Sequence, residues 1–469
     1  MSTNSTIAAI STGLVNSGIS IIKISGDKAL EVISKMFSNY KKLTPNKIIY
    51  GKIYNNEKKV MDDVLVSYFK APNSYTGEDV CEINCHGGKQ ITLEILEEVL
   101  KNGAIMAKPG EFSKRAFING KLDLSQAEAI CNLIESKSKV ESKIAINQLE
   151  GKLSENIKNI KKDLIDLLAQ VEVSIDYPEY DYEELENQSL IDMLENKKSK
   201  IKAIIDTYDE GKVIKDGVNV AILGAPNVGK SSLLNRLANY EKAIVTDIPG
   251  TTRDIVDETI NINNLILNIS DTAGIRNTQD IVEKIGVEKT IKKLDEVDLV
   301  LYLVSADQAI KDIDIEVINK IKAKNLKYLV VINKIDTEET EEKINKKNSE
   351  IFVKNMDILK KNGIINIVQI SALKDIGINK LKSEIIKIFN LNDFDYNKDY
   401  VIVNKRHKDL LDKAYQMLIM SQQELKKSSP IDIVSISIKQ AADYLGQIVG
   451  EDVSEDIINT LFKNFCIGK

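Results

Sequence analysis

Cysteine is scarce in this chain, and other signs of a secreted or membrane protein are also missing. Four cysteines in 469 residues are too few for a disulfide framework, so a reducing cytosol is the default compartment. No uninterrupted apolar run approaches the roughly 18 residues that a membrane-spanning helix needs. The first lysine is Lys23, so the N-terminal stretch lacks the basic region of a signal peptide. These absences predict a soluble, cytoplasmic protein that uses no membrane.

An excess of basic residues is missing as well. The net charge is −6, so any contact with RNA would use a local patch or a partner protein. Arginine is rarer still, because only five of the 64 basic residues are arginines. An arginine in such a lysine-rich background hints that planar, forked geometry is needed. The five are Arg115, Arg236, Arg253, Arg276 and Arg406.

The chain is long enough for about three domains, and its patterns change along the sequence. Residues 1–120 mix short β-rich runs such as "SIIKIS", "VLVSYF" and "VCEINC" with helical stretches near 27–36 and 89–101, which predicts an α+β domain. Residues 121–215 and 391–469 have helical periodicity. Residues 216–390 alternate apolar runs with helical patterns, as parallel sheets with crossover helices do. The predicted fold is therefore multidomain, with an α/β domain inserted into an α-helical domain.

The segment "GAPNVGKSS" has the spacing of a phosphate-binding loop. It follows the strand-like run "VNVAILG" and opens the helical run "SSLLNRLANY", which is the context this motif requires. Backbone N–H groups and the helix N-terminus would surround the phosphates. Lys230 would reach the β- and γ-phosphates, and the Ser231 hydroxyl would bind Mg²⁺. The predicted contacts of this loop are Asn227, Val228, Gly229, Lys230, Ser231 and Ser232.

Three further motifs follow on successive strand-like runs. "DTAG" places a carboxylate near the Mg²⁺ site and the Gly274 N–H near a γ-phosphate. "NKID" ends in Asp336, whose carboxylate can accept two hydrogen bonds from guanine but not from adenine. "SAL" suits a turn that supports the base. Together they predict a GTPase domain that uses Asp271, Thr272, Ala273, Gly274, Asn333, Lys334, Asp336, Ser371 and Ala372.

A switch segment lies between the first two motifs. "TDIPGTTRD" contributes Thr246, Asp247, Ile248, Thr251 and Thr252, of which Thr252 is the predicted second hydroxyl on Mg²⁺.

Ile275 stands where Ras-like proteins have a water-orienting glutamine. Another group must therefore orient the water: Arg276, Asp280, Glu283 or a partner. The Asn227 amide oxygen could hold a monovalent cation in place of an arginine finger.

The chain resembles a known family at this point. The GTPase motifs, "NSYTGEDVCEINCHGG", "KPGEFSKRAFINGKLDLSQAEAI" and the terminal "FCIGK" are similar to the MnmE (TrmE) tRNA uridine-modifying GTPases. The resemblance implies a homodimer formed through the N-terminal domain. It also implies a flavoprotein partner, MnmG, in a heterotetramer or larger complex. The two proteins would place an aminomethyl or carboxymethylaminomethyl group on carbon 5 of the tRNA wobble uridine.

The resemblance also implies roles for individual residues of the GTPase domain. K⁺ would be held by Asn227, Thr246, Ile248 and Thr251. Glu283 would orient the attacking water through a bridging water, and without the resemblance it would be an exposed helical charge.

A tetrahydrofolate derivative, 5-formyl or 5,10-methylene, would supply the one-carbon unit. Its implied ligands are Lys23, Glu82, Lys121 and Lys469. Asn16 and Lys23 stand where the family commonly has arginines, and a lysine cannot make a two-pronged contact.

The terminal "CIGK" has the spacing of a prenylation box, but its final lysine and Gly468 do not suit that signal. The run "DIINTLFKNFCIGK" instead predicts a helix that continues nearly to the last residue. The resemblance places the tail at the folate pocket, with Cys466 as a catalytic thiol near the one-carbon donor.

Other cysteines and histidines have simpler interpretations. Cys81 and Cys85 are predicted as buried strand residues rather than zinc ligands, because the usual partner pair is missing. Cys131 is predicted to lie in a helical core. His407 lies in the basic run "KRHK", which predicts a solvated helix start.

Two alternative functions use the same GTPase motifs. One is an Era-like switch in ribosome or RNA assembly, whose flanking domains only bind. The other is a membrane-attached signalling GTPase, which depends on the prenylation box alone.

Overall fold

The computed structural model describes residues 5–176, 187–240, 258–269, 294, 297–336, 342–391, 398, 400–427 and 429–468. The chain forms two compact units. The first unit contains residues 1–134, 145–205 and 405–469, and the second contains residues 135–144 and 206–404.

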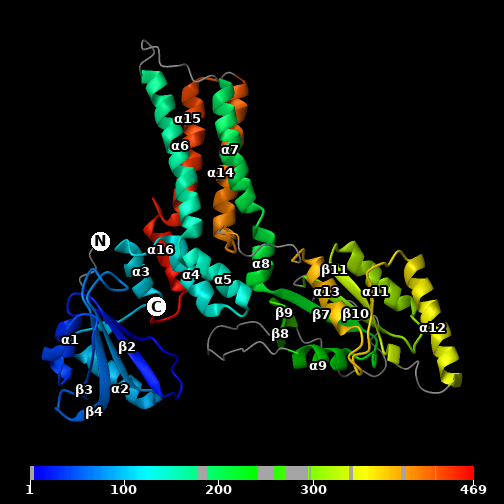
Figure 1. Ribbon diagram of the computed structural model, residues 1–469, viewed down its shortest axis with the longest axis horizontal. Helices are drawn as coiled ribbons and strands as arrows, with labels where there is room; N and C mark the ends of the chain where they lie inside the picture. Colours follow the sequence, from blue (N-terminus) through cyan, green and yellow to red (C-terminus); the bar gives the residue numbers. More distant parts are fainter. Residues whose placement is uncertain are drawn as a thin grey trace. The chain divides into compact units, whose positions relative to one another are not determined.

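The first unit begins with a six-stranded sheet in the order β3-β4-β5-β2-β1-β6 (Figure 1). All its neighbouring strands are antiparallel except β1 and β6. Its strands are β1 (Ile7–Ile10), β2 (Ile19–Ser25), β3 (Ile48–Tyr54), β4 (Val60–Phe69), β5 (Val80–His86) and β6 (Ile105–Met106). The three β-rich runs predicted from the sequence are β2, β4 and β5. The prediction missed β1, β3 and β6.

The two faces of this sheet differ because successive side chains of a strand point to opposite sides. Ile22 and Ile24 of β2 are fully buried on the face packed with α1 (Ala29–Met36) and α2 (Lys89–Lys101). A short 3₁₀ helix (Tyr40–Lys42) follows α1. The alternate residue Lys23 lies on the other face, where Ile7 and Ala9 of β1 pack against Phe112.

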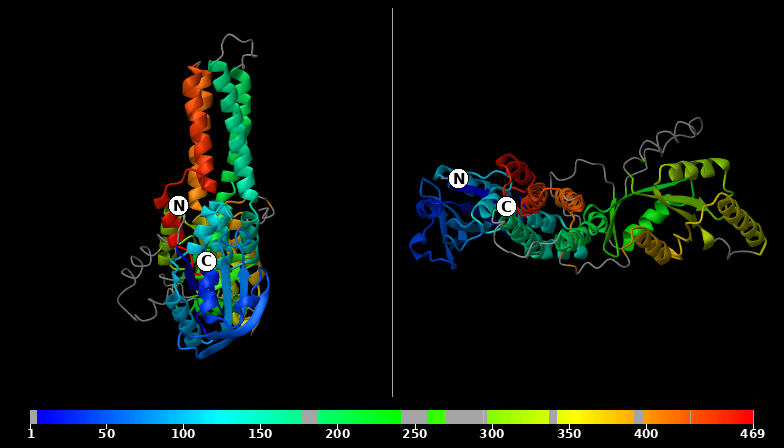
Figure 2. Two further views of the ribbon diagram at one scale, coloured as in Figure 1. Left: turned by 90° about the vertical axis from the view of Figure 1, so that its left-hand side faces the viewer. Right: turned by 90° about the horizontal axis from the view of Figure 1, so that it is seen from above.

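Helices form the rest of the first unit, as predicted for both helical stretches. Four long helices lie side by side in Figures 1 and 2, where α15 packs against α6 and α14, and α14 packs against α7. They are α6 (Lys152–Asp176), α7 (Asn187–Ile205), α14 (Lys405–Lys426) and α15 (Ile431–Val449). The shorter helices are α3 (Glu111–Ile118), α4 (Leu124–Glu135), α5 (Lys139–Leu149), whose first part belongs to the second unit, and α16 (Glu455–Lys463).

The second unit is built on a sheet in the order β12-β11-β10-β7-β9-β8. Five of these strands are parallel, and the central ones are almost completely buried and apolar, as expected for a sheet covered by helices. The strands are β7 (Val218–Gly224), β8 (Glu258–Ile262), β9 (Leu265–Ile269), β10 (Leu299–Ser305), β11 (Lys327–Asn333) and β12 (Ile367–Gln369). The helices are α8 (Tyr208–Asp216), α9 (Lys230–Tyr240), α11 (Asp312–Ala323), α12 (Glu342–Lys361) and α13 (Ile378–Ile388).

The apolar runs "VNVAILG", "LILNIS", "DLVLYLV", "YLVVIN" and "NIVQIS", predicted as strands from the sequence, are the five parallel strands, but the prediction missed β8. This strand pairs antiparallel with β9 through a two-residue turn, Asn263–Asn264, in which both residues have positive φ. Such turns match the twist of a hairpin, and asparagine tolerates this backbone conformation. The alternation in "ETINI" and the asparagine pair are the signals that could have identified the hairpin.

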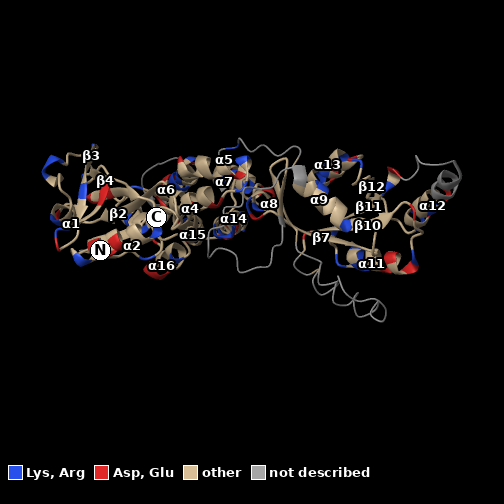
Figure 3. Ribbon diagram, turned by 90° about the horizontal axis from the view of Figure 1, so that it is seen from below, with Lys and Arg blue, Asp and Glu red and all other residues tan. Residues whose placement is uncertain are grey.

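Among the described residues, no helix is both long and apolar enough to cross a membrane. Basic and acidic residues are interspersed along both units (Figure 3). This mixed distribution agrees with the small net charge of the chain, −6.

Candidate functional site

The predicted phosphate-binding loop connects β7 directly to α9, which begins at Lys230. Gly224 and Gly229 have φ of 143° and 98°, and Asn227 is also left-handed. A Cβ atom at Gly229 would lie 2.2 Å from Nδ2 of Asn333. Glycine is therefore required for the loop to approach this side chain. The loop and helix start fit a phosphate chain, as the motif predicts.

Lys230 folds back onto its own loop. Its Nζ donates hydrogen bonds of 2.8 Å to the carbonyl oxygens of Gly224 and Ala225. Burial lowers the pKa of Lys230, because a partly desolvated ammonium favours its neutral form. An anionic ligand would compensate this cost, so the side chain is placed where phosphate charge would stabilise it.

Asn333 joins the three loops of the predicted nucleotide site. Its Nδ2 donates to the Val228 carbonyl (2.9 Å), and its Oδ1 accepts from the Ala372 amide (3.0 Å). The side chain lies at the carboxyl end of β11, and the carboxyl ends of its parallel neighbours β10 and β12 lie at the same edge of the sheet. Ligands of open α/β sheets bind at these ends. The structure therefore brings the predicted phosphate loop and the predicted base-binding segments together.

Arg236 was not predicted as a site residue. From α9, its Nε and one terminal nitrogen donate to the carbonyl oxygens of Ala372 (3.0 Å) and Leu373 (2.7 Å). The guanidinium thus supports the "SAL" turn, where the Ser371 Oγ also accepts from the Lys374 amide. The rarity of arginine in this chain was the available signal, because a forked contact with two carbonyls suits arginine.

Several predicted residues lie outside the part of the chain that the structure describes. In the GTPase region these are Thr246, Asp247, Ile248, Thr251, Thr252, Asp271, Thr272, Ala273, Gly274 and Glu283. The terminal residue Lys469 is outside it as well.

A second group of predicted residues lies on the sheet of the first unit. Lys23 and Glu82 are partners across β2 and β5, and their charged groups are 3.8 Å apart. The Lys23 ammonium lies 5.2 Å from the centre of the Tyr75 ring and 5.6 Å from that of Phe112. Lys121 contacts the same 72–77 loop, because its Nζ donates to the Pro72 carbonyl (3.1 Å). Basic donors and an acidic acceptor therefore lie on or beside the loop that contains Tyr75.

The C-terminal tail docks onto the first unit. The helix prediction for this segment is wrong beyond Lys463, where α16 ends. The following residues are held by backbone contacts, in which the Gly110 amide donates to the Cys466 carbonyl (3.2 Å) and Ser11 Oγ donates to the Gly468 carbonyl (3.1 Å). Gly468 has φ 90°, and a Cβ there would lie 2.3 Å from the Ile10 carbonyl oxygen. Tertiary contacts thus replace the helical ones.

The cysteines of β5 pack as predicted. Cys81 and Cys85 are buried in the core of the first sheet, and burial raises the pKa of Cys81 to about 12. His86 lies on the opposite, exposed side, 2.7 Å from Asp62. These residues therefore do not share one metal site. Cys131 is half-buried against the cluster of Leu124 and Phe462.

The prediction for His407 is wrong. Its side chain is fully buried, and Nε2 lies 2.6 Å from a carboxylate oxygen of Glu128 in α4. Arg406 makes two hydrogen bonds to the same carboxylate (2.9 and 2.8 Å) and donates to the last carbonyls of α15. The basic run was therefore misread because its acidic partner is distant in sequence.

Two families of known proteins match the chain. The family described as "GTP-binding protein TrmE N-terminus" matches residues 6–121. The family described as "MnmE helical domain" matches residues 124–466.

Relatives match over the whole length. A protein of Acetivibrio thermocellus named "tRNA modification GTPase MnmE" is 46% identical over 468 residues, which are 99% of each chain. A protein of Clostridioides difficile with the same name is 44% identical and also covers 99% of each chain. Among solved structures, an Aquifex aeolicus Era variant bound to GDP and AlF4⁻ is 30% identical over 43% of this chain and 67% of its own, with a TM-score of 0.28.

Proposed function

The chain belongs to the MnmE family of tRNA modification GTPases, and from that premise we propose the reaction that it performs. It is a GTP hydrolase that acts in tRNA modification. In our proposal it adds an aminomethyl or carboxymethylaminomethyl group to carbon 5 of the wobble uridine in the cytoplasm. The flavoprotein MnmG is its partner, and a tetrahydrofolate derivative is the one-carbon donor.

The observation that carries this proposal is the sheet face of the first unit. Lys23, Glu82 and Lys121 converge there on the loop that contains Tyr75. In the proposed complex the basic groups bind the glutamate tail and pterin carbonyl of the folate, and Glu82 accepts hydrogen bonds from the pterin ring. Lys469 adds a further basic group. An Era-like assembly switch, the alternative function, needs no such pocket.

The domain plan follows the same proposal. We assign residues 1–120 to a folate-binding and dimerisation domain, 121–215 and 391–469 to the helical domain, and 216–390 to an inserted Ras-like GTPase domain.

A homodimer is supported by the apolar side chains on the exposed face of β2, β3 and β4. Ile19, Ile48 and Tyr50 are each more than 60% exposed there, and Leu65 of β4, the partner of Tyr50, is 43% exposed. Such patches mark protein contacts. A purified chain that sediments as a monomer would contradict the dimer.

The tRNA of cells that lack the protein provides the test of the proposed reaction. Digested tRNA from such cells should lose the modified wobble uridine, as measured by nucleoside mass spectrometry, and the wild-type gene should restore it. If the thiol acts in the chemistry, the Cys466→Ser protein should still hydrolyse GTP. Its gene should nevertheless fail to restore the modified nucleoside in the deletion strain. Unchanged nucleosides in the deletion strain would favour the assembly switch, and full restoration by Cys466→Ser would reduce the cysteine to packing.

GTP hydrolysis requires charge stabilisation that Ile275 cannot help to provide. We propose that Asn227, Thr246, Ile248 and Thr251 hold K⁺, while Ser231 and Thr252 hold Mg²⁺ and Glu283 orients the water. When bound, the two cations would offset the negative charge that develops on the phosphates. Asn227 is exposed on the phosphate loop, where an amide oxygen can face a ligand.

Replacing K⁺ by Na⁺ should lower the rate of GTP hydrolysis by roughly 100-fold, since one stabilising group contributes about that much. Asn227→Ala should have a similarly low rate in K⁺ and lose the difference between the two ions. Asn235→Ala, at an exposed position of α9, is the matched control and should retain the K⁺ preference. Equal wild-type rates in K⁺ and Na⁺, measured as phosphate release, would disprove the K⁺ site.

A further inference from the structure

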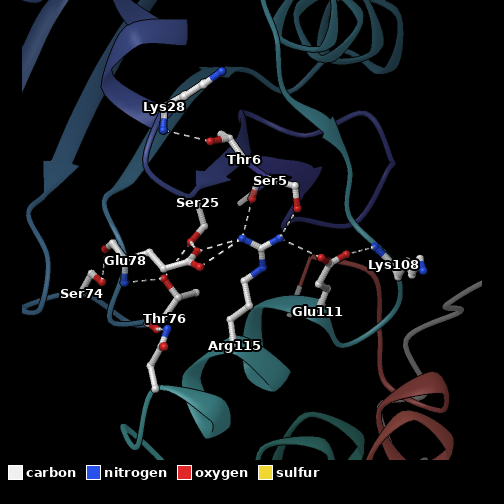
Figure 4. Close-up of polar contacts among 11 residues, drawn as sticks. Ser5, Thr6, Ser25, Lys28, Ser74, Thr76, Glu78, Lys108, Glu111 and Arg115 are labelled. Atoms are coloured by element: carbon white, nitrogen blue, oxygen red, sulfur yellow. Dashed lines mark hydrogen bonds and ion pairs between the residues drawn. The ribbon is translucent and has the colours of Figure 1, made fainter. Parts of the chain in front are cut away.

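Arg115 is a buried guanidinium at the centre of the first unit's polar network (Figure 4). The residue lies in α3 and is only 2% exposed. One of its terminal nitrogens donates to Glu78 (3.1 Å to each oxygen) and to the Ser5 carbonyl (2.7 Å). The other donates to Glu111 (2.9 Å) and Ser5 Oγ (3.1 Å). A single planar group therefore joins the chain start, a loop and its own helix.

The Glu78 contact leads to the loop that faces Lys23. Glu78 also accepts from Ser25 Oγ (2.7 Å), and Ser25 Oγ is 2.7 Å from Thr76 Oγ1. Thr76 and Ser25 are fully buried. Tyr75, the residue before Thr76, has its ring beside the Lys23 ammonium, and its hydroxyl lies 2.7 Å from Ser113 Oγ of α3. This branch of the network holds the backbone beside Tyr75, and the Ser113 contact holds the end of its ring.

The Glu111 contact leads to the C-terminal tail. Glu111 accepts from Arg115 through one carboxylate oxygen and from the Lys108 amide (2.8 Å) through the other. This pair of contacts holds the 108–111 turn. The turn contains Gly110, whose amide donates to the Cys466 carbonyl. The packing is tight, because a Cβ at Gly110 would lie 2.6 Å from the Phe462 carbonyl oxygen.

We propose that Arg115 is a positioning residue that holds the Tyr75 loop and the Cys466 tail in fixed positions relative to each other. It acts through the two carboxylates that it bridges, Glu78 and Glu111. The inference deepens the proposed folate site and rests on it for the identity of the ligand. The coupling of loop and tail rests on the contacts alone.

Lysine cannot replace arginine in this network. The guanidinium uses four N–H groups that point in fixed directions toward partners on three segments. A lysine ammonium is a compact donor with three N–H groups and no fork. Arg115→Lys would therefore keep the charge that both carboxylates need, but it could not bridge Glu78 and Glu111 with the same geometry. A comparison of this variant with the wild type therefore separates the effect of the forked hydrogen-bond geometry from the effect of the positive charge.

The position of the tail can be measured through the Cys466 thiol. The full-length chain would be treated with iodoacetamide, and the alkylation rate of each cysteine would be followed by mass spectrometry. In Arg115→Lys we expect Cys466 to react at least about tenfold faster, because its turn is released. Cys81 and Cys85 are buried in the core of the same sheet, so their rates report general loosening and should not change. Lys101→Ala, an exposed change on α2, is the control.

Binding of 5-formyltetrahydrofolate gives the second readout. We expect its dissociation constant to rise about tenfold or more in Arg115→Lys, since the Tyr75 loop loses its support. Glu111→Gln cuts only the tail branch, because a side-chain amide offers one acceptor oxygen instead of two. It should therefore speed Cys466 alkylation and change folate affinity less than Arg115→Lys does.

Two results would overturn the role of Arg115. One is a Cys466 alkylation rate in both Arg115→Lys and Glu111→Gln that equals the wild-type rate. The other is a parallel increase at Cys81, Cys85 and Cys466, which would indicate general loosening. If the wild-type chain fails to bind 5-formyltetrahydrofolate, the proposed folate site fails, and the alkylation rates still decide whether Arg115 positions the tail.

Discussion

Asp336→Asn is expected to change the base specificity of the nucleotide site from guanine to xanthine. The aspartate offers two acceptor oxygens to the ring N–H and amino group of guanine, whereas asparagine offers one acceptor and one donor. Its amide would face the guanine amino group, while xanthine presents a carbonyl there. Sites built to hydrogen-bond a ligand reject a mismatched analogue by roughly 10⁴-fold. GTP affinity should fall by about that factor, and XTP affinity should rise.

The placement of this residue supports the expectation. Asp336 is half-buried just after β11, and the turn before it is held by the Ile335 amide, which donates to the Ile370 carbonyl (3.3 Å). Titrations with GTP and XTP, together with hydrolysis rates for both, would measure the change. Asp357→Asn, an exposed change on α12, should leave GTP preferred. Unchanged GTP affinity in Asp336→Asn would remove this residue from the base site.

Glu128→Ala is expected to destabilise the helical part of the first unit by about 3–5 kcal/mol. The carboxylate is almost completely buried between Arg406 and His407. Its removal leaves the Arg406 guanidinium without its anionic partner. The same guanidinium joins the end of α15 to the start of α14, so this junction should loosen as well. Native-state hydrogen exchange on peptides from α4, α14 and α15 would measure the loss. Glu135→Ala, at the exposed end of α4, should change exchange little, and equal protection in both variants would contradict the expectation.

The same cluster predicts an acid-dependent loss of stability. Burial alone would raise the pKa of Glu128, but the charges and hydrogen bonds of His407 and Arg406 outweigh burial and lower the pKa from 4.5 to about 2. The stabilisation is therefore complete above about pH 4.5 and is lost as the pH falls toward 2. A shift of this size corresponds to about 3 kcal/mol. Glu128→Gln should lack this acid-dependent loss of stability. A free energy of unfolding that falls with pH as steeply in Glu128→Gln as in the wild type would therefore refute the prediction.

The strand–loop–helix geometry of the predicted phosphate loop could be read from the sequence because the motif is local. Gly224 to Ser232 lie within one strand–loop–helix segment, where a short stretch of sequence determines the geometry. Asn333 and Ser371 were also predicted, since each follows a buried strand and parallel strands end at one edge of the sheet. The sequence pattern did not indicate which residues these side chains contact in the folded protein. The Asn333 bridge from Val228 to Ala372 and the Arg236 contacts cross from one segment to another.

The two wrong predictions have the same cause. The basic run around His407 looks solvated because its anionic partner Glu128 is 279 residues away. The tail after Lys463 has helical periodicity, but contacts with Gly110 and Ser11 hold it in an irregular conformation. Local propensity is a weak prior, and tertiary context often outweighs it.

The amino-acid sequence by itself determined the GTPase motifs, the strand and helix periodicities and the resemblance to the family. Each of these depends on residues close together in the chain or on spacing that a motif preserves. Only the tertiary structure decided that Arg115 joins Glu78 to Glu111, that Glu128 lies against Arg406 and His407, and that Cys466 docks beside Gly110. The physical reason is that buried charges and irregular backbone are stable only when folding supplies their partners, and those partners come from distant segments.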